Sequence, residues 1–329
     1  MDESLLNIED SIKKYRANAI SIAVIDNYEI KEVVSYGKKV NNDTMFQVAS
    51  ISKFVTAIAT LRLVEKKYLD LDKDISEYLG EETPKKLFGG VANATIRQIL
   101  THTAGFNNKG YMGYESGSIL PTTSEILSGK KPSISPRVKQ THSVGNTWRY
   151  SGGGFMVLQR IIEKITNTSF DRFVTDCVFI PLNMNNSSFN QFPKSNIANG
   201  YTRKGKSISG GHLLMPQLAA AGLWSTANDL AKLGLHLQKI LNGEQGLVSK
   251  ELIEEMVKPQ IIAKGGAYSG LGCAIKKVND IECFGHSGSN LGFKSDIMFS
   301  RENGKGSCIL ANSDSSFPLI EKLEREFIK

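Results

Sequence analysis

Residues 43–66 read DTMFQVASISKFVTAIATLRLVEK, and they carry the strongest structural signal in the chain. From Ser52 to Lys66 the apolar residues fall at helical spacing, on a stripe made of Val55, Ile58, Ala59 and Leu63. Strand-like sequence directly precedes this helix, and a lysine at its end suits a helix C-terminus. We therefore expect a strand that leads into a long helix, with Ser50-Ile51-Ser52-Lys53 at the junction.

The Ser50–Lys53 pair has the spacing of a nucleophile and its base. Residues three apart share a helix face, so the Lys53 amine would lie one turn from the Ser50 hydroxyl. Serine becomes a nucleophile when a neighbour accepts its proton, and burial can keep a lysine neutral for that task. The free N–H groups at the helix start would also favour an oxyanion. Ser-x-x-Lys recurs at Ser11, Ser35 and Ser128, so the alternative interpretation is a surface pair in a lysine-rich chain.

A second candidate is Tyr150, which precedes Ser151-Gly152-Gly153-Gly154 near a predicted helix start. A phenol presented in a cleft can shuttle protons, especially where neighbouring cations lower its pKa. The alternative interpretation is an aromatic anchor on a glycine turn. A dinucleotide-binding G-x-G-x-x-G pattern fails here, because residue 157 is not glycine.

A third candidate is His286-Ser287-Gly288-Ser289, which follows a predicted strand over residues 281–285. A strand edge that lines a cleft can offer backbone N–H groups to an oxyanion, and its side chains can hold a substrate carbonyl or carboxylate. The alternative interpretation is a histidine in a hairpin turn. The remaining histidines are predicted to be structural: His102, His142, His212 and His236.

Strand-like runs occupy both ends of the chain, and helical patterns fill the middle. The strands are predicted at residues 19–26, 29–37, 270–278, 281–285, 293–300 and 306–312. The helices are predicted at residues 3–17 (with Leu5), 52–66, 95–101, 155–166 and 169–179. Two further helices are predicted, one that begins at the Thr226-x-x-Asp229 cap and one that follows Pro318. This order predicts an α+β fold, in which helices flank one antiparallel β-sheet that pairs the N-terminal hairpin with the C-terminal strands. An all-helical domain would be inserted into it. The sheet domain would comprise residues 1–74 and 207–329, the inserted and mainly helical domain residues 75–206, and the cleft between them would hold the site.

Composition excludes several classes of protein. The 329 residues are 40% hydrophobic and 22% charged, which is ordinary for a globular protein. The net charge of +7 is spread as short lysine pairs rather than as a basic block with aromatic residues, so no nucleic-acid partner is expected. The four cysteines form no CxxC pair, and neither a disulfide framework, a metal site nor a cofactor is expected.

The sequence does not choose between two locations for the chain. No stretch approaches the roughly 20 apolar residues of a membrane helix, so no transmembrane segment is expected. The N-terminus lacks the apolar core of a signal peptide. The expected location is the cytoplasm, or outside it if a leader has been removed.

In this order and spacing, the three motifs resemble those of the serine β-lactamase and penicillin-binding family. The nearest subgroup is the class C-like one, which contains class C β-lactamases, D-alanyl-D-alanine carboxypeptidases, D-aminopeptidases and esterases. The resemblance runs from about Asp43 to Asn312. Further matching segments are Thr44-x-Phe46, Leu69-Asp70-Leu71-Asp72, residues 100–106 (LTHTAGF) and residues 222–226 (GLWST).

The resemblance implies a role for each motif. Ser50 would be the acylated nucleophile, and Lys53 would take or share its proton. Tyr150 would relay a proton to the leaving group and later help to activate water. The backbone N–H groups of Ser50 and Ser289 would form the oxyanion hole. The substrate would be bound by the residues that stand where the family often has Lys-Thr-Gly, namely His286, Ser287 and Gly288.

Two departures from the family pattern bear on the substrate. Gly152 stands where the family has the asparagine of Tyr-x-Asn, so the side-chain amide that would bond a β-lactam is missing. His286 replaces a fixed cation and is at best half-charged near neutral pH. The resemblance therefore implies a serine hydrolase that acts through an acyl-enzyme on a small-molecule or peptide amide or ester, as a D-amino-acid peptidase, carboxypeptidase or esterase. The alternatives are a weak β-lactamase on the same site and a non-catalytic binder of peptides or acylated ligands.

Overall fold

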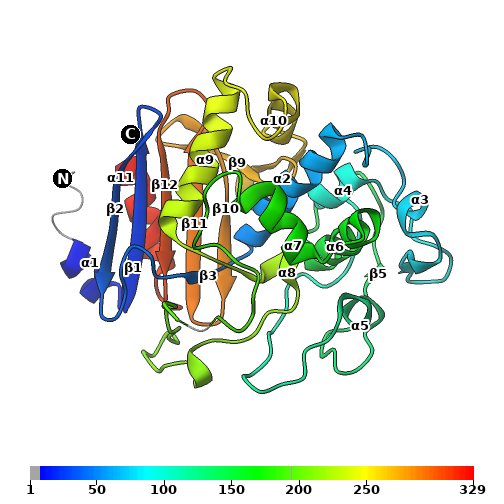
Figure 1. The fold of residues 1–329 in the computed structure, drawn as a ribbon, viewed down its shortest axis with the longest axis horizontal. Coiled ribbons are helices and arrows are strands. Elements are labelled where there is room, and N and C mark those ends of the chain that lie inside the picture. The colour runs from blue at the N-terminus through cyan, green and yellow to red at the C-terminus, as the bar shows by residue number, and fades with distance from the viewer. Residues whose placement is uncertain (1–7, 194) are drawn as a thin grey trace.

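A computed structural model describes residues 8–193 and 195–329. Its centre is an eight-stranded sheet with the order β2-β1-β12-β11-β10-β9-β8-β7, in which every neighbouring pair is antiparallel. Helices cover both faces of this sheet (Figure 1), so the expected α+β class is confirmed. The sheet strands are β1 (Ala19–Asp26), β2 (Glu29–Gly37), β7 (Ile261–Ile262), β8 (Tyr268–Ser269), β9 (Ala274–Val278), β10 (Ile281–Asn290), β11 (Phe293–Ser300) and β12 (Gly306–Ala311).

An N-terminal and a C-terminal strand lie side by side near one edge of the sheet. Strand β1 is apolar and buried along almost its whole length, as expected of a strand covered on both faces. It pairs with β2 through a tight turn at Asn27 and Tyr28, both of which have positive φ. On its other side β1 pairs with β12, where Ile22 lies opposite Ile309. The predicted pairing of the N-terminal hairpin with the C-terminal strands is thus confirmed.

The helices divide between the two faces and one end of the sheet. They are α1 (Ile8–Lys14), α2 (Ile51–Glu65), α3 (Ser76–Leu79), α4 (Ile96–Leu100), α5 (Thr123–Ser128), α6 (Gly152–Thr166), α7 (Phe170–Val174), α8 (Leu218–Ala221), α9 (Ala227–Leu241), α10 (Lys250–Met256) and α11 (Phe317–Phe327). In Figure 1, α9 crosses the near face of the sheet, α11 lies behind it, and α3 to α7 gather at the right. The apolar residues of α1 and α11 form one core with β1 and β12, and those of α2 and α9 belong to a second and larger core.

Several element boundaries differ from those predicted. Strand β10 continues to Asn290 instead of ending at residue 285, and α6 begins at Gly152 rather than at residue 155. Helix α11 begins at Phe317 with the proline inside its first turn, where the missing N–H has no intrahelical role. The helix predicted over residues 169–179 is α7 followed by a π-helical turn. Of the helix predicted over residues 3–17, the part from Ile8 to Lys14 is confirmed, while residues 3–7, with Leu5, lie outside the described residues.

The region predicted to form an inserted domain is mainly helical. It is not entirely helical, because β4 (Lys85–Lys86) and β5 (Lys139–Gln140) pair within it as a short parallel ladder. Its helices share one apolar core with the sheet: α2 packs on α6 and on β10, and Phe54 of α2 lies 6.4 Å from Phe284 of β10 between ring centroids. The division into residues 1–74 with 207–329 and residues 75–206 therefore stays a prediction. No helix in the described part of the chain combines the length and apolar character needed to cross a bilayer.

A packing test follows from the contact between α9 and the sheet. A Cβ atom at Gly234 of α9 would overlap the Phe299 ring of β11. Alanine favours a helix over glycine by up to about 1 kcal/mol, but forcing a methyl group into a packed core costs about 1–3 kcal/mol. We expect Gly234→Ala to lower the free energy of unfolding in urea. The exposed control Glu251→Ala in α10 should stay within about 0.5 kcal/mol of the parent protein. A Gly234→Ala protein at least as stable as the parent would contradict the packing described.

Candidate active site

Ser50 stands at a sharp junction between strand and helix. Strand β3 (Phe46–Ala49) ends at Ala49, whose φ of +50° is a left-handed conformation that costs a non-glycine residue roughly 1–2 kcal/mol. Two bonds hold this turn: the Ser52 hydroxyl donates to the Ala49 carbonyl at 2.6 Å, and the Ser295 hydroxyl of β11 donates to the Val48 carbonyl at 2.9 Å. Ser50 is thereby fixed at the first turn of α2, where backbone N–H groups lack helical partners.

Lys53 lies beside Ser50 and out of water. Its Nζ atom is 3.2 Å from the Ser50 Oγ atom and 2.6 Å from the Ala220 carbonyl oxygen of α8, and the residue is 2% exposed. Burial lowers the pKa of Lys53 to about 7, since a charged amine loses its hydration there. A large fraction of the amine is therefore neutral near neutral pH, and it lies within hydrogen-bond reach of the one hydroxyl that it would deprotonate.

Tyr150 completes the cluster from the other side of the cleft. It precedes α6, whose first turn is capped by the Ser151 hydroxyl as it accepts from the Gly154 N–H at 3.0 Å. The Tyr150 ring lies 4.9 Å from the Lys53 Nζ atom. Burial raises the pKa of Tyr150, and a hydrogen bond with the Ser50 side chain opposes that shift only in part. Burial outweighs that hydrogen bond, so Tyr150 is a protonated phenol that can donate.

The third motif lies inside strand β10 rather than in a turn after it. A two-residue turn with positive φ at Asn279 and Asp280 joins β9 to β10, so Ile281 directs its backbone groups toward β9. The backbone N–H and C=O groups of alternate residues in a strand point to the same side. Those of Ser287 and Ser289 therefore point to the β9 side as well. Strand β9 stops opposite Gly285, so the N–H groups of Ser287 and Ser289 face an edge that β9 does not cover.

Gly288 allows this open edge to approach Ser50. A Cβ atom at Gly288 would overlap the Val48 carbonyl oxygen and the Ser295 hydroxyl. Because Val48 is two residues from Ser50, the close approach brings the open edge of β10 to the start of α2. Ser287 and Ser289 are exposed on this edge, whereas Gly288 is buried. The structure thus brings the three predicted motifs together, and the role of each residue stays a prediction.

His286 is a neutral member of the site. It is 8% exposed, and burial together with the charge of Lys53 lowers its pKa to about 4. Its Nδ1 atom donates to the Ser287 carbonyl oxygen at 2.6 Å, which leaves Nε2 as a free acceptor. The residue that stands in place of a family lysine therefore supplies no positive charge at neutral pH.

His102 was predicted to be structural, but it is packed directly against Tyr150. The two rings lie 4.3 Å apart between centroids, and the Ser151 N–H donates to the His102 Nδ1 atom at 3.2 Å. Burial, Lys53 and His286 all lower the pKa of His102, so its ring is neutral and accepts this bond. The only sequence signal for this position was its place in the LTHTAGF segment, since no spacing links residue 102 to residue 150.

The missing side chain at Gly152 has a structural counterpart. A Cβ atom at Gly152 would lie 2.9 Å from the Cε2 atom of Tyr111 and 3.2 Å from the Asn108 carbonyl oxygen. The Tyr111 ring therefore occupies the space that an asparagine at position 152 would need. The sequence indicates that position 152 lacks the family's asparagine side chain, but it does not indicate that the Tyr111 ring occupies that space.

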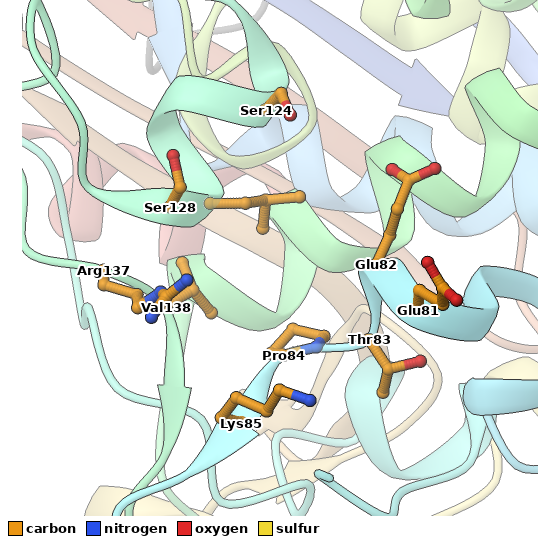
Figure 2. A pocket seen from close by; sticks show the side chains of 10 residues that line it. Glu81, Glu82, Thr83, Pro84, Lys85, Ser124, Ser128, Arg137 and Val138 are labelled. Atoms are coloured by element: carbon orange, nitrogen blue, oxygen red, sulfur yellow. The ribbon is translucent and has the colours of Figure 1, made fainter.

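The competing Ser-x-x-Lys matches lack the burial found at Lys53. Lys14, Lys38 and Lys131, the partners of Ser11, Ser35 and Ser128, are all exposed. Ser128 lines a separate cavity of about 190 Å³ between α5 and the segment around Pro84 (Figure 2), and neither Lys131 nor any of the three motifs lines it. Across residues 8–193 and 195–329, no three His, Cys, Asp or Glu side chains gather in a way that could hold a metal ion.

Comparisons relate this chain to known proteins. The family model described as "Beta-lactamase" matches residues 7–326. A putative D-alanyl-D-alanine carboxypeptidase of Salmonella gallinarum is 26% identical over 261 residues, which cover 74% of this chain and 56% of that protein. Esterase EstB of Burkholderia gladioli is 30% identical over 162 residues, or 46% of this chain and 40% of that protein. The matches thus span about half the length of these two curated relatives.

A solved structure extends the likeness to the whole fold. The octameric penicillin-binding protein homologue of Pyrococcus abyssi superposes with a TM-score of 0.81 at 24% identity, over 98% of this chain and 76% of that one.

The buried amine of Lys53 predicts a pH-dependent stability. Its folded-state pKa of about 7 lies below its ordinary value of 10.5, so the folded protein binds fewer protons than the unfolded chain between these two values. The free energy of unfolding should therefore rise with pH across that window, by up to about 1.4 kcal/mol per pH unit from this residue. We expect Lys53→Met to remove this contribution, so that its stability advantage over the parent is largest at pH 7 and shrinks toward pH 9. Urea unfolding of both proteins at pH 7, 8 and 9 measures it, and parallel pH profiles would contradict it.

Proposed function

The chain belongs to the beta-lactamase family, and we propose that it is a serine hydrolase that cleaves an amide or ester through an acyl-enzyme on Ser50. The observation that carries this proposal is the hydrogen bond between the Lys53 amine and the Ser50 hydroxyl at 3.2 Å, made by an amine that burial holds near neutrality. Tyr150 supports it, because a phenol that keeps its proton is placed against the same hydroxyl.

Acylation begins with the Ser50–Lys53 pair. The neutral Lys53 amine accepts the Ser50 proton while the Ser50 oxygen bonds to the substrate carbonyl carbon. Negative charge moves to the carbonyl oxygen, where the N–H groups of Ser50 and Ser289 donate to it. Tyr150 gives its proton to the leaving nitrogen or oxygen as the scissile bond breaks. The Lys53 ammonium then returns a proton to the Tyr150 oxygen, and both groups regain their starting states.

Deacylation uses the same groups in reverse. Water attacks the acyl carbon and loses a proton to the Tyr150–Lys53 pair, and the Ser50 oxygen leaves with a proton from that pair. The N–H groups of Ser50 and Ser289 again bear the developing charge. Each turnover therefore consumes one water molecule, releases one acid and one amine or alcohol, and needs no further reactant.

The proposed substrates are small molecules or peptides of the D-amino-acid amide, peptide or ester type. Neutral His286 offers no fixed charge to a substrate carboxylate, and the Tyr111 ring replaces the side chain that would bond a β-lactam acylamide. Both features weigh against an efficient β-lactamase. Weak turnover of β-lactams on the same site is the second candidate, since it would use the same nucleophile and oxyanion donors.

The nucleophile is tested by Ser50→Ala. We expect this variant to lose labelling by a fluorophosphonate probe and to lose at least about a thousandfold in kcat/KM on esters, D-amino-acid amides and any β-lactam that turns over, because Ser50 carries the hydroxyl that the Lys53 amine reaches. Ser35→Ala, at one of the competing Ser-x-x-Lys matches, is the matched control and should retain both labelling and turnover. Full labelling of Ser50→Ala would place the nucleophile elsewhere. Tight but unproductive binding of every compound by the parent would favour the non-catalytic binder.

The base is tested by the pH profile of kcat/KM. Only neutral Lys53 can accept the Ser50 proton, so the rate should increase with pH through a midpoint near 7 and then level off. A midpoint near 4 would instead assign the titration to His286, whose pKa is lowered to about 4. A midpoint near 10 would mean that Lys53 is charged at neutral pH and cannot accept the Ser50 proton there. Intrinsic fluorescence at each pH controls for unfolding.

A further inference from the structure

A cavity of about 200 Å³ opens next to the catalytic cluster, where the far end of the sheet faces the helical elements. On the helical side it is lined by His102, Trp148 and Tyr150. On the sheet side it is lined by Tyr268 of β8, by the start of β9, and by His286 and Ser287 of β10. Tyr150 and His286 thus belong both to the cavity wall and to the site, so a substrate held at Ser50 lies beside this space.

The position of the cavity assigns it to one half of the substrate. In the proposed function, Tyr150 protonates the leaving group, so the leaving atom must lie against the Tyr150 hydroxyl. Ser289, which bonds the carbonyl oxygen, does not line the cavity, whereas Ser287 and His286 do. A substrate bound along β10 therefore has its carbonyl oxygen at Ser289 and its leaving group near His286, in this cavity.

The lining is aromatic. Trp148 lies 6.0 Å from Tyr150 and 6.1 Å from His102 between ring centroids, and Tyr268 adds a further ring from the sheet side. Flat apolar groups gain both buried area and favourable ring contacts in such a space. The Trp148 Nε1–H is buried and has no hydrogen-bond partner within the described part of the chain. It can therefore donate to one polar atom at the edge of a bound aromatic group.

The charges around the cavity disfavour an ionised leaving group. Burial lowers the pKa of both His102 and His286, so neither is a cation at neutral pH. Lys264 is the one lysine or arginine among the residues found to line the cavity, and it is exposed at the rim. None of the lining residues that the structure describes is Asp or Glu. A carboxylate placed here would lose its hydration without a fixed partner.

We propose, on the premise of the serine hydrolase function above, that this cavity is the leaving-group subsite and that it selects an uncharged aromatic amine or alcohol, with Trp148 and Tyr268 as its specificity-determining residues. The substrate class narrows accordingly, from amides and esters in general to those whose leaving group carries a neutral ring. A terminal D-alanine, whose carboxylate is ionised, is a poor leaving group for this site.

The proposal is tested with three butyrate esters that differ only in the alcohol: ethyl, benzyl and 4-carboxybenzyl. We expect kcat/KM for the benzyl ester to exceed that of each of the other two by at least about tenfold, because a ring in a fitted apolar pocket is worth that much and a buried carboxylate is penalised. A matched pair with the ring on the acid side, phenylacetate against acetate as ethyl esters, should show no comparable preference.

Two variants assign the preference to the cavity. Tyr268→Ala and Trp148→Ala should reduce the benzyl-to-ethyl ratio of kcat/KM severalfold, whereas Tyr268→Phe, which keeps the ring, should preserve it. Tyr68→Ala is the control, because Tyr68 is also an exposed tyrosine and lines a different cavity. The ratio is the informative quantity, since a general loss of folding lowers both rates alike. Tyr268 is 43% exposed, so its replacement is tolerated even if Trp148→Ala does not fold.

The possible failures are distinguishable. Equal kcat/KM for the three esters, a ratio unchanged in Tyr268→Ala, or a ring preference that follows the acid would overturn the subsite while Ser50 labelling and ester turnover still support the hydrolase. Absence of both turnover and Ser50 labelling would overturn the proposed function and the subsite with it.

Discussion

The site depends on the exclusion of water from one amine. Lys53 is 2% exposed, and this loss of hydration favours the uncharged amine even though the Ala220 carbonyl and the Phe155 and Tyr150 rings lie close to its Nζ atom. His286 and His102 are themselves buried beside this amine, and their own desolvation is the main cause of their lowered pKa values. Burial therefore keeps both imidazoles neutral near pH 7, and a protonated Lys53 adds to the lowering of their pKa values. Burial of the Lys53 amine is also a local cost to stability, which the apolar core around α2 must offset.

The sheet supplies the other half of the site by ending early at one edge. Strand β9 stops opposite Gly285, while β10 continues for five more residues with β11 as its partner. The uncovered backbone then lies against β3, because Gly288 has no side chain to hold the two apart. An edge strand left open in this way normally invites association with another strand. Here its open groups are drawn toward the start of α2 and are available to a substrate carbonyl.

Local patterns predicted the parts of this protein that local interactions determine. The limits of β1 and β2 follow from a buried apolar run and a turn, and α2 follows from its apolar stripe. The continuation of β10 was missed, because His-Ser-Gly-Ser has little strand propensity and pairing with β11 decides its conformation. The three glycines at 152–154 suggested a turn, but they form the first turn of α6. Gly153 approaches the Asn107 carbonyl so closely that a Cβ atom would lie 2.5 Å from its oxygen. The contacts of His102, Tyr111 and Tyr268 are purely tertiary, and no spacing in the sequence signals them.

The Tyr111 ring beside Gly152 constrains how this site can change over evolutionary time. An asparagine introduced first at position 152 would clash with the Tyr111 ring, so that step is unfavourable while the ring is present. Loss of the ring as a first step leaves a void at the start of α6. The two replacements are therefore mutually dependent, and neither single mutant is a smooth intermediate. A chain that carries this pair is therefore expected to change at both positions together or at neither.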